Sequence, residues 1–276
     1  MALMRTNIYP KSITDACVTS FLLVIIPVIY YFELWVVLPR FYDTWSFKYL
    51  FHFCIGNFIL FNICSNLIAI ILTDTSISGK ILPAEGGKDW RFCSVCESLT
   101  PPRSWHCSIC NICILKRDHH CIFTSCCIGH NNHRFFLVFV FYMFIATVYS
   151  SIFNIQFIDA YVKFDSWVNL TKIIFPLAML FLEWTENQLY VAFIIIVLLG
   201  SAFTAVLLYY HLSMILNGLV TPERKLKTSL YDQGKIRNLE VVLGRRWYLV
   251  WISPFLKSEL TCDGINWEAM HSTKEK

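Results

Sequence analysis

Long apolar runs separated by polar segments set the pattern of this chain. The four longest runs occupy residues 17–38, 49–72, 135–158 and 189–216. An α-helix needs about 20 apolar residues to cross a hydrocarbon layer of about 30 Å. Each run reaches that length, so the pattern predicts four membrane-spanning helices.

A fifth apolar segment, residues 173–184, precedes the fourth long run. It contains Pro176 and is shorter than a standard span requires. We expect this segment to be re-entrant or to lie at the membrane interface.

The basic residues support the same number of spans and orient the chain. With four spans, the N-terminus, the polar loop 73–134 and the tail 217–276 lie on one side, which carries most of the Lys and Arg residues. An excess of Lys and Arg marks the cytosolic side of a membrane protein. A fifth span would move the basic tail to the opposite side, so four spans are expected, with the polar loop in the cytosol.

Composition agrees with this assignment. Apolar residues make up 56% of the chain and charged residues only 15%, which is typical of a multi-span membrane protein. The net charge of +4 is too small to indicate nucleic-acid binding. We expect no removable signal peptide and, because the second residue is Ala2, no N-myristoylation.

The polar loop is rich in metal-binding residues. Eight of the twelve cysteines fall between residues 93 and 127, several of them separated by two residues. This spacing lets one turn direct two sulfurs at a single metal, and tetrahedral zinc takes four such ligands. The membrane spans and the spacing favour zinc in a reducing compartment over disulfides. The loop offers enough candidates for two zinc sites with some left over: Cys93, Cys96, His106, Cys107, Cys110, Cys113, His120, Cys121, Cys126 and Cys127.

The same loop carries residues suited to nucleophilic catalysis. A thiol with an ordinary pKa of about 8.5 needs help to ionise near pH 7. In extended backbone, residues two apart point the same way, so His119 can reach Cys121; Asp118 can orient His119 only if the loop bends back. This is an arrangement of nucleophile, base and orienting group. The alternatives are a further metal ligand or an inert thiol for Cys121, a shared ligand for His119 and a loop cap for Asp118.

The full pattern is Cys-x2-Cys-x9-His-Cys-x2-Cys-x2-Cys-x4-Asp-His-His-Cys-x5-Cys, beginning at Cys93. It resembles the cysteine-rich domain of the DHHC family of protein S-acyltransferases (palmitoyltransferases). The resemblance implies two structural zinc ions and palmitoyl-CoA, or another long-chain acyl-CoA, as co-substrate. It also implies that Cys121 forms an S-acyl enzyme, with His119 as the base and Asp118 as its partner. The interleaved zinc ligands implied are Cys93, Cys96, His106 and Cys113 for one ion, and Cys107, Cys110, His120 and Cys127 for the other.

The expected fold is an all-α polytopic membrane protein with a cytosolic two-zinc domain between helices 2 and 3. Its parts are residues 1–72 with the first two spans, the loop 73–134 built from short strands and turns, residues 135–216 with the last two spans, and the tail 217–276. An acyl chain held among the helices contributes about 0.8 kcal/mol per buried CH₂. Candidate contacts for acyl-CoA are Arg103, Lys116, Arg117 and Arg134 for the phosphates, and Phe123 and Phe136 for the chain. Each basic residue fits a solvated or lipid-headgroup face equally well, and each phenylalanine also fits ordinary membrane-facing packing.

The chain departs from the family pattern after Cys121. Ile122 and Phe123 stand where the family usually has Pro-Trp, a departure expected to affect rate rather than reaction class. Two segments of the tail resemble family motifs: residues 220–223 match one in part, and residues 231–247, with Asn238, match another. The competing hypothesis is a catalytically silent, zinc-bearing membrane scaffold or accessory subunit. For the enzyme, we expect membrane-proximal protein substrates with cytosolic cysteines, and a location in the endoplasmic reticulum or Golgi.

Overall fold

The computed structural model describes residues 4–83, 85–87, 89–161, 167–182, 184–226 and 230–267. Its contacts divide the chain into two compact units. The cysteine-rich unit comprises Met1–Leu22, Cys64–Phe139 and Tyr209–Lys276. The helical unit comprises Leu23–Ile63 and Val140–Leu208.

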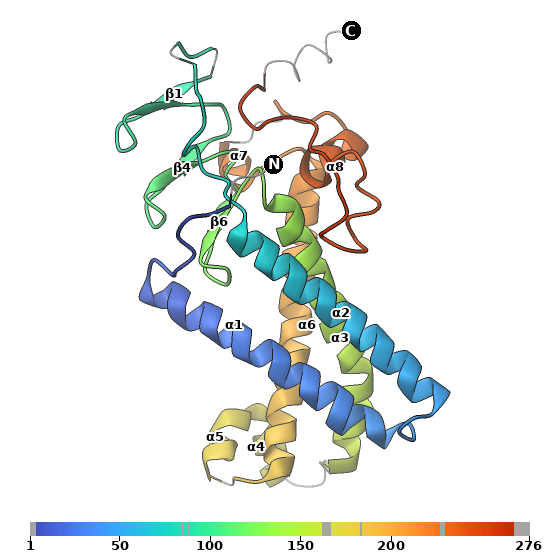
Figure 1. Cartoon of the computed structure of the whole chain (residues 1–276). Coiled ribbons are helices and arrows are strands. Elements are labelled where there is room, and N and C mark those ends of the chain that lie inside the picture. Colours follow the sequence, from blue (N-terminus) through green and yellow to red (C-terminus); the bar gives the residue numbers. More distant parts are fainter. Residues whose placement is uncertain are drawn as a thin grey trace. The chain divides into compact units, whose positions relative to one another are not determined.

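Four of the described helices are long and apolar enough to cross a membrane, and they confirm the predicted number (Figure 1). The first is α1 (Ile13–Tyr31), which continues as a π-helical turn, η1 (Phe32–Val37), and a 3₁₀ turn, η2 (Leu38–Arg40). The others are α2 (Phe47–Leu72), α3 (His133–Tyr161) and α6 (Glu186–Leu216). In each span, the most apolar stretch of 18 residues has a mean hydropathy between 2.0 and 2.8.

Helices α1 and α6 begin a few residues before their apolar runs because capping groups, not hydrophobicity, set their first turns. Helix α1 starts before residue 17 because the Ser12 hydroxyl accepts a hydrogen bond from the backbone N–H of Asp15 (3.0 Å). Helix α6 starts after Thr185, whose hydroxyl accepts the N–H of Gln188 (3.2 Å). A side-chain oxygen at this position satisfies an N–H that has no partner within the helix.

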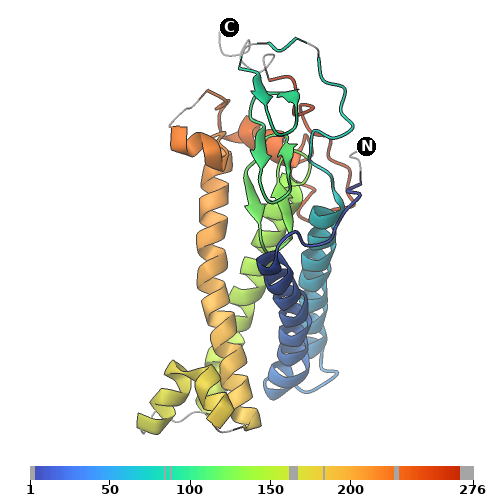
Figure 2. The ribbon, with the colours of Figure 1, turned by 90° about the vertical axis from the view of Figure 1, so that its left-hand side faces the viewer.

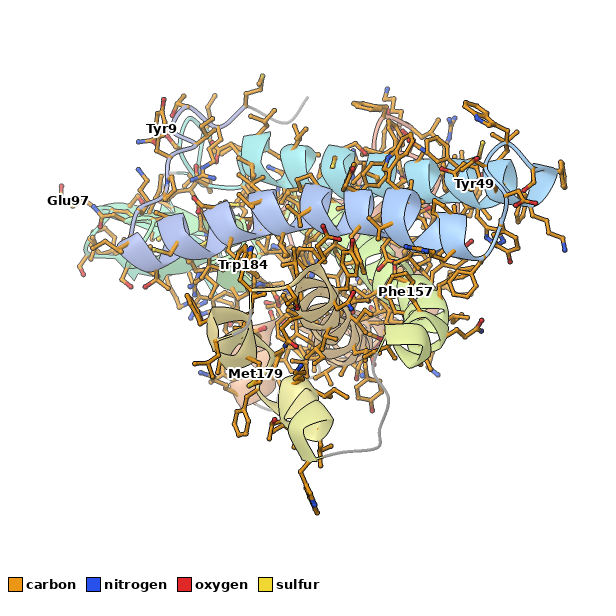
Figure 3. The ribbon with its side chains drawn as sticks, turned by 90° about the horizontal axis from the view of Figure 1, so that it is seen from below. Tyr9, Tyr49, Glu97, Phe157, Met179 and Trp184 are labelled. Atoms are coloured by element: carbon orange, nitrogen blue, oxygen red, sulfur yellow. The ribbon has the colours of Figure 1, made fainter. Side chains whose placement is uncertain are left out.

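The helical unit has an aromatic core and two short helices. Phe32, Val37, Phe157 and Ile194 form a buried cluster, and Phe157 is labelled in Figure 3. The helices α4 (Trp167–Ile174) and α5 (Pro176–Leu182) have eight and seven residues, which is too short to cross a membrane. Residues 173–182 and 184 of the fifth apolar segment are described. Its assignment as re-entrant or interfacial stays a prediction.

The cysteine-rich unit contains three two-stranded antiparallel hairpins that follow one another (Figures 1 and 2). They pair β1 (Arg91–Cys93) with β2 (Ser98–Thr100), β3 (Trp105–Cys107) with β4 (Ile112–Ile114), and β5 (His119–Cys121) with β6 (Cys126–Ile128). Each hairpin turn ends in a residue with positive φ, namely Glu97, Asn111 or Ser125. The expectation of short strands and turns in the loop is confirmed, and the three hairpins share one turn geometry.

The tail of the same unit is anchored to the end of α6. The short helices α7 (Thr221–Leu226) and α8 (Lys235–Leu243) follow, and α8 ends at Gly244, whose φ of 85° suits glycine. The Asn238 side chain donates to the carbonyl of Leu216 (2.9 Å) and to Asp232 (2.7 Å). Asn238 therefore ties α8 to the last turn of α6.

Candidate active site and zinc-binding loop

The three hairpins bring together two groups of four ligands. One group is Cys93, Cys96, His106 and Cys113; the other is Cys107, Cys110, His120 and Cys127. Within each group the ligand atoms lie within 4.8 Å of one another. The membership of both groups is the interleaved one that the family resemblance implies.

The spacing of these atoms matches what a zinc ion requires. Tetrahedral zinc, with Zn–S of about 2.3 Å and Zn–N of about 2.0 Å, separates a sulfur from a nitrogen by roughly 3.5 Å and two sulfurs by roughly 3.8 Å. The Nδ1 of His106 lies 3.4 Å from the Cys96 sulfur and 3.8 Å from that of Cys93. The Nδ1 of His120 lies 3.3 Å from the Cys110 sulfur, which is 3.7 Å from that of Cys127. Both groups therefore fit a zinc ion.

The knuckle turns preorganise the first two cysteines of each group. The backbone N–H of Cys96 donates to the Cys93 sulfur (3.4 Å), and that of Cys110 donates in the same way to Cys107 (3.4 Å). These bonds favour the thiolate that metal binding requires. A domain built from three short hairpins has little apolar core, so bound metal would supply much of its folding energy.

The third hairpin has the same turn but lacks a complete set of knuckle ligands. Cys121 takes the place that Cys93 and Cys107 have in the first two hairpins, and Thr124 takes the place of their second cysteine. Among the described residues, Cys121 belongs to neither four-ligand group. This replacement explains in simple terms why the Cys121 thiol is left free for other chemistry.

Cys126 is likewise in neither group. Its sulfur is buried, 3.8 Å from the carbonyl oxygen of Ile70, and burial raises the pKa of its thiol to about 11. A thiol in this state is a poor nucleophile.

The strand β5 places Asp118 and His119 beside Cys121. The loop does bend back, since the carboxylate of Asp118 accepts a hydrogen bond from Nδ1 of His119 at 2.7 Å. His119 lies close enough to Cys121 for its hydrogen bonding and charge to lower the pKa of that thiol. Because Nδ1 faces Asp118, this leaves Nε2 for the sulfur. Asp118, His119 and Cys121 thus lie together on one strand and the residue before it, and their catalytic roles stay a prediction.

Electrostatics favour a charged His119 and Cys121 pair. Burial opposes charge on His119, but hydrogen bonds to Asp118 and Cys121 raise its pKa to about 9. Burial also opposes a thiolate at Cys121, yet the hydrogen bond and charge of His119 outweigh it and leave the pKa of this thiol lowered. The Asp118 carboxyl is buried as well, and the contacts with His119 and His211 hold its pKa well below the usual range.

Three further contacts of this site were missed in the sequence. Thr221, at the start of α7, donates its N–H (2.9 Å) and its hydroxyl (3.1 Å) to Oδ1 of Asp118. His211 of α6 lies 3.5 Å from Oδ2 of the same carboxylate. The carboxylate of Asp15 lies 3.3 Å from Nε2 of His120, where it orients a metal ligand. The available signals were a polar residue just before or inside an apolar run, for Asp15 and His211, and the partial family motif at residues 220–223, for Thr221; the partners of all three are about 100 residues away.

Two of the residues expected to contact CoA phosphates are buried instead. Arg103 forms a two-point ion pair with Glu223, at 2.6 and 2.7 Å, and Lys116 is almost fully buried nearby. Burial lowers the pKa of Lys116 to about 8, and the charge of Arg103 adds to the effect. This counts against a phosphate-binding role for both, since neither cation faces solvent.

The remaining expected acyl-CoA contacts are less enclosed, with one exception. Arg117 is half-buried beside Cys107 and Cys127 of the second ligand group, whose sulfurs raise the pKa of its guanidinium against the opposing effect of burial. Arg134 is also half-buried, and it donates to the carbonyl of Ser258 (2.8 Å). Phe123 is half-buried, whereas Phe136 is buried with its ring edge-on to His119, at a centroid distance of 5.1 Å.

Together these observations define a multi-pass membrane protein whose loop combines two zinc-type ligand groups with a thiol, an imidazole and a carboxylate in contact. The family profile described as DHHC palmitoyltransferase matches residues 87–228. The chain is 34% identical over 230 residues to probable palmitoyltransferase ZDHHC24 of Danio rerio, covering 82% of this chain and 78% of that protein. The proteins of the same name from Mus musculus and Homo sapiens are 34% and 33% identical, over 76% and 78% of this chain and 75% and 77% of their own. The chain belongs to the DHHC palmitoyltransferase family and is a protein S-acyltransferase.

Proposed function

We propose that this enzyme transfers a long-chain acyl group from acyl-CoA, palmitoyl-CoA foremost, to cysteine thiols of membrane-associated proteins. In the first half, the sulfur of Cys121 attacks the thioester carbonyl carbon and CoA leaves as its thiol. In the second half, the thiol of a protein substrate attacks the Cys121 thioester, and the free Cys121 thiol is regenerated. Each half forms one thioester and breaks one, so no oxidant or further co-reactant is needed.

His119 moves the proton in both halves. It takes the proton of the Cys121 thiol and gives it to the departing CoA sulfur, then takes the proton of the incoming substrate thiol and returns it to Cys121. Asp118 fixes the tautomer and direction of the imidazole and stabilises it when charged. The observation that carries this proposal is the position of Cys121 on the same strand as His119, outside both metal-ligand groups, with His119 bonded to Asp118 and lowering the pKa of the thiol.

The two zinc ions are assigned a structural role. Each four-ligand group is closed, and a bound zinc ion would supply folding energy to the loop rather than an activated water. The ligands proposed are those of the two groups described above. A zinc ion in the second group would also hold β5, and with it Cys121, in place, because its ligand His120 lies on that strand.

The acyl chain is proposed to extend toward the membrane helices, past Phe136 and Phe123, with the CoA phosphates near Arg117 and Arg134. Support comes from Phe136, which packs against His119 and so borders the reacting groups. The excess of basic residues in the loop and tail supports a cytosolic active site. The endoplasmic reticulum or Golgi is the proposed location, with protein substrates that carry cytosolic cysteines near the membrane.

Labelling of the purified protein tests the proposal. The wild-type chain is incubated with palmitoyl-CoA labelled in the acyl group, and hydroxylamine-labile label on the protein is measured. We expect label on the wild type and on Cys126→Ala, a matched control at a buried cysteine outside both ligand groups, and none on Cys121→Ser. Equal label on wild type and Cys121→Ser, or none on either, would instead support a silent zinc-bearing scaffold.

A further inference from the structure

A second histidine contacts the carboxylate that orients His119. His211, in the last part of α6, is buried, and its Nδ1 lies 3.5 Å from Oδ2 of Asp118. The same oxygen accepts the shorter bond of 2.7 Å from Nδ1 of His119. Two imidazoles therefore share one carboxylate oxygen, unequally.

The rings of the two histidines also pack together. Their centroids are 5.1 Å apart with an interplanar angle of 34°. Phe136 presents an edge to both of them, at 5.1 Å from His119 and 4.8 Å from His211. The His119 ring is thus confined by His211 and by Phe136, in addition to its bond with Asp118.

The other oxygen of the carboxylate is fixed separately. Oδ1 of Asp118 accepts both the N–H and the hydroxyl of Thr221. The bond from His119 cannot fix the carboxylate independently, because His119 is the group that the carboxylate orients, and Thr221 leaves the carboxylate free to pivot about Oδ1. A contact from His211 to Oδ2 removes that freedom, because it comes from a different helix and acts on the second oxygen.

We propose that His211 is a positioning residue of this enzyme, which holds the Asp118 carboxylate and the His119 ring so that Nε2 of His119 stays directed at Cys121. The proposal rests on the proposed function of Cys121 as the acyl acceptor. His211 acts through Asp118 and His119 and is not required to touch the acyl group. Alignment of a base with its nucleophile changes the rate of the chemical step more than the affinity for the substrate.

Three substitutions at residue 211 separate this role from simple packing. Asn places an amide N–H close to the position of the histidine Nδ1, Gln places one closer to Nε2, and Leu has neither. Tyr209→Leu is the matched control, since it makes the same kind of change two residues earlier at an exposed position of α6. Zinc content per chain, measured on each full-length variant in detergent, reports whether the loop has folded.

The measurement is the single-turnover rate of hydroxylamine-labile labelling by palmitoyl-CoA, together with the concentration that gives half the maximal rate. We expect His211→Leu to lower the maximal rate by about tenfold, at the low end of the effect of a polar contact with a charged group, with little change in the half-saturating concentration. His211→Asn should stay within about threefold of wild type, because it restores the donor. Tyr209→Leu should match the wild type.

The proposal is overturned if His211→Leu labels at the wild-type rate, if Asn and Leu are equally slow, or if only the half-saturating concentration changes. Should the Leu variant fail to retain zinc, the comparison of Asn with Gln decides: a faster Asn variant supports the proposal, and equal rates overturn it. Wild type and Cys121→Ser are measured in parallel. Unlabelled wild type would refute the proposed function itself, whereas a labelled wild type with an equally active His211→Leu refutes only this inference.

Discussion

Substitution of Glu223 by Gln would remove one charge from a buried ion pair and leave the other. The side chains of Arg103 and Glu223 are 2% and 3% exposed, and both carboxylate oxygens bind the guanidinium. Oε2 also accepts the backbone N–H of Val220 (3.0 Å). The variant Glu223→Gln keeps the size of the side chain, so its effect comes from the charge.

The magnitude follows from the burial of the pair. Breaking a buried ion pair by removing one partner costs about 3–5 kcal/mol, because the remaining charge stays out of water without a counter-ion. Arg103 keeps its bond to the Gly218 carbonyl (2.8 Å) and its position over the rings of Tyr231 and Trp267, so it cannot readily turn toward solvent. With roughly 2–4 °C of melting temperature per kcal/mol for a protein of this size, we expect a decrease of about 6–20 °C.

The assay is thermal unfolding of the purified protein in detergent, followed by the loss of folded protein and by zinc release. The control is Glu259→Gln, the same substitution in an ion pair with Lys257 whose side chains are 65% and 81% exposed; we expect no measurable change there. The smallest shift expected from a loss of 1 kcal/mol is about 2 °C. A melting temperature of Glu223→Gln within about 2 °C of wild type in this assay would therefore refute the reasoning. Helix α7, which contains Glu223, also contains Thr221, whose N–H donates to Asp118. We therefore expect Glu223→Gln to slow acyl labelling as well.

Three further predictions concern the same loop. Asp15→Asn should weaken zinc binding at the group that contains His120 by about 10- to 100-fold, measured by competition with a chelator, because it removes the charge that orients this ligand. Cys93→Ala should lower the zinc content measured by atomic emission from two ions per chain to one, since it removes a ligand of a single group; an unchanged content would contradict the ligand assignment. Gly129→Ala should destabilise the protein, because a Cβ there would lie 2.7 Å from the carbonyl oxygen of Leu115, whereas Gly200→Ala meets only one atom, at 3.6 Å, and should be tolerated; equal melting temperatures would contradict this.

The composition of the two zinc groups could be predicted because ligand spacing and family resemblance act over a short stretch of chain. Cysteines two residues apart are held on one turn by local backbone geometry, so their pairing needs little knowledge of the rest of the fold. The position of Cys121 outside the groups is also local once the third hairpin is recognised as a knuckle with Thr124 in place of a cysteine. The prediction that Arg103 and Lys116 contact the CoA phosphates did not allow for their burial. The partner of Arg103 is Glu223 in the tail, and a basic residue in a polar loop gives no sign of so distant a partner.

The sequence by itself determined the four apolar spans, because they depend on residue type and length alone. With the family resemblance it also predicted the two ligand groups and the proposed reacting residues, which lie within a short stretch of chain. Only the tertiary structure decided what supports them. Asp15 contacts His120 across 105 residues, and Glu223 contacts Arg103 across 120. His211 reaches Asp118 from the end of α6, about 90 positions further along the chain. Such contacts depend on how helices and hairpins pack in three dimensions, and no periodicity within one segment records which distant side chain will meet it.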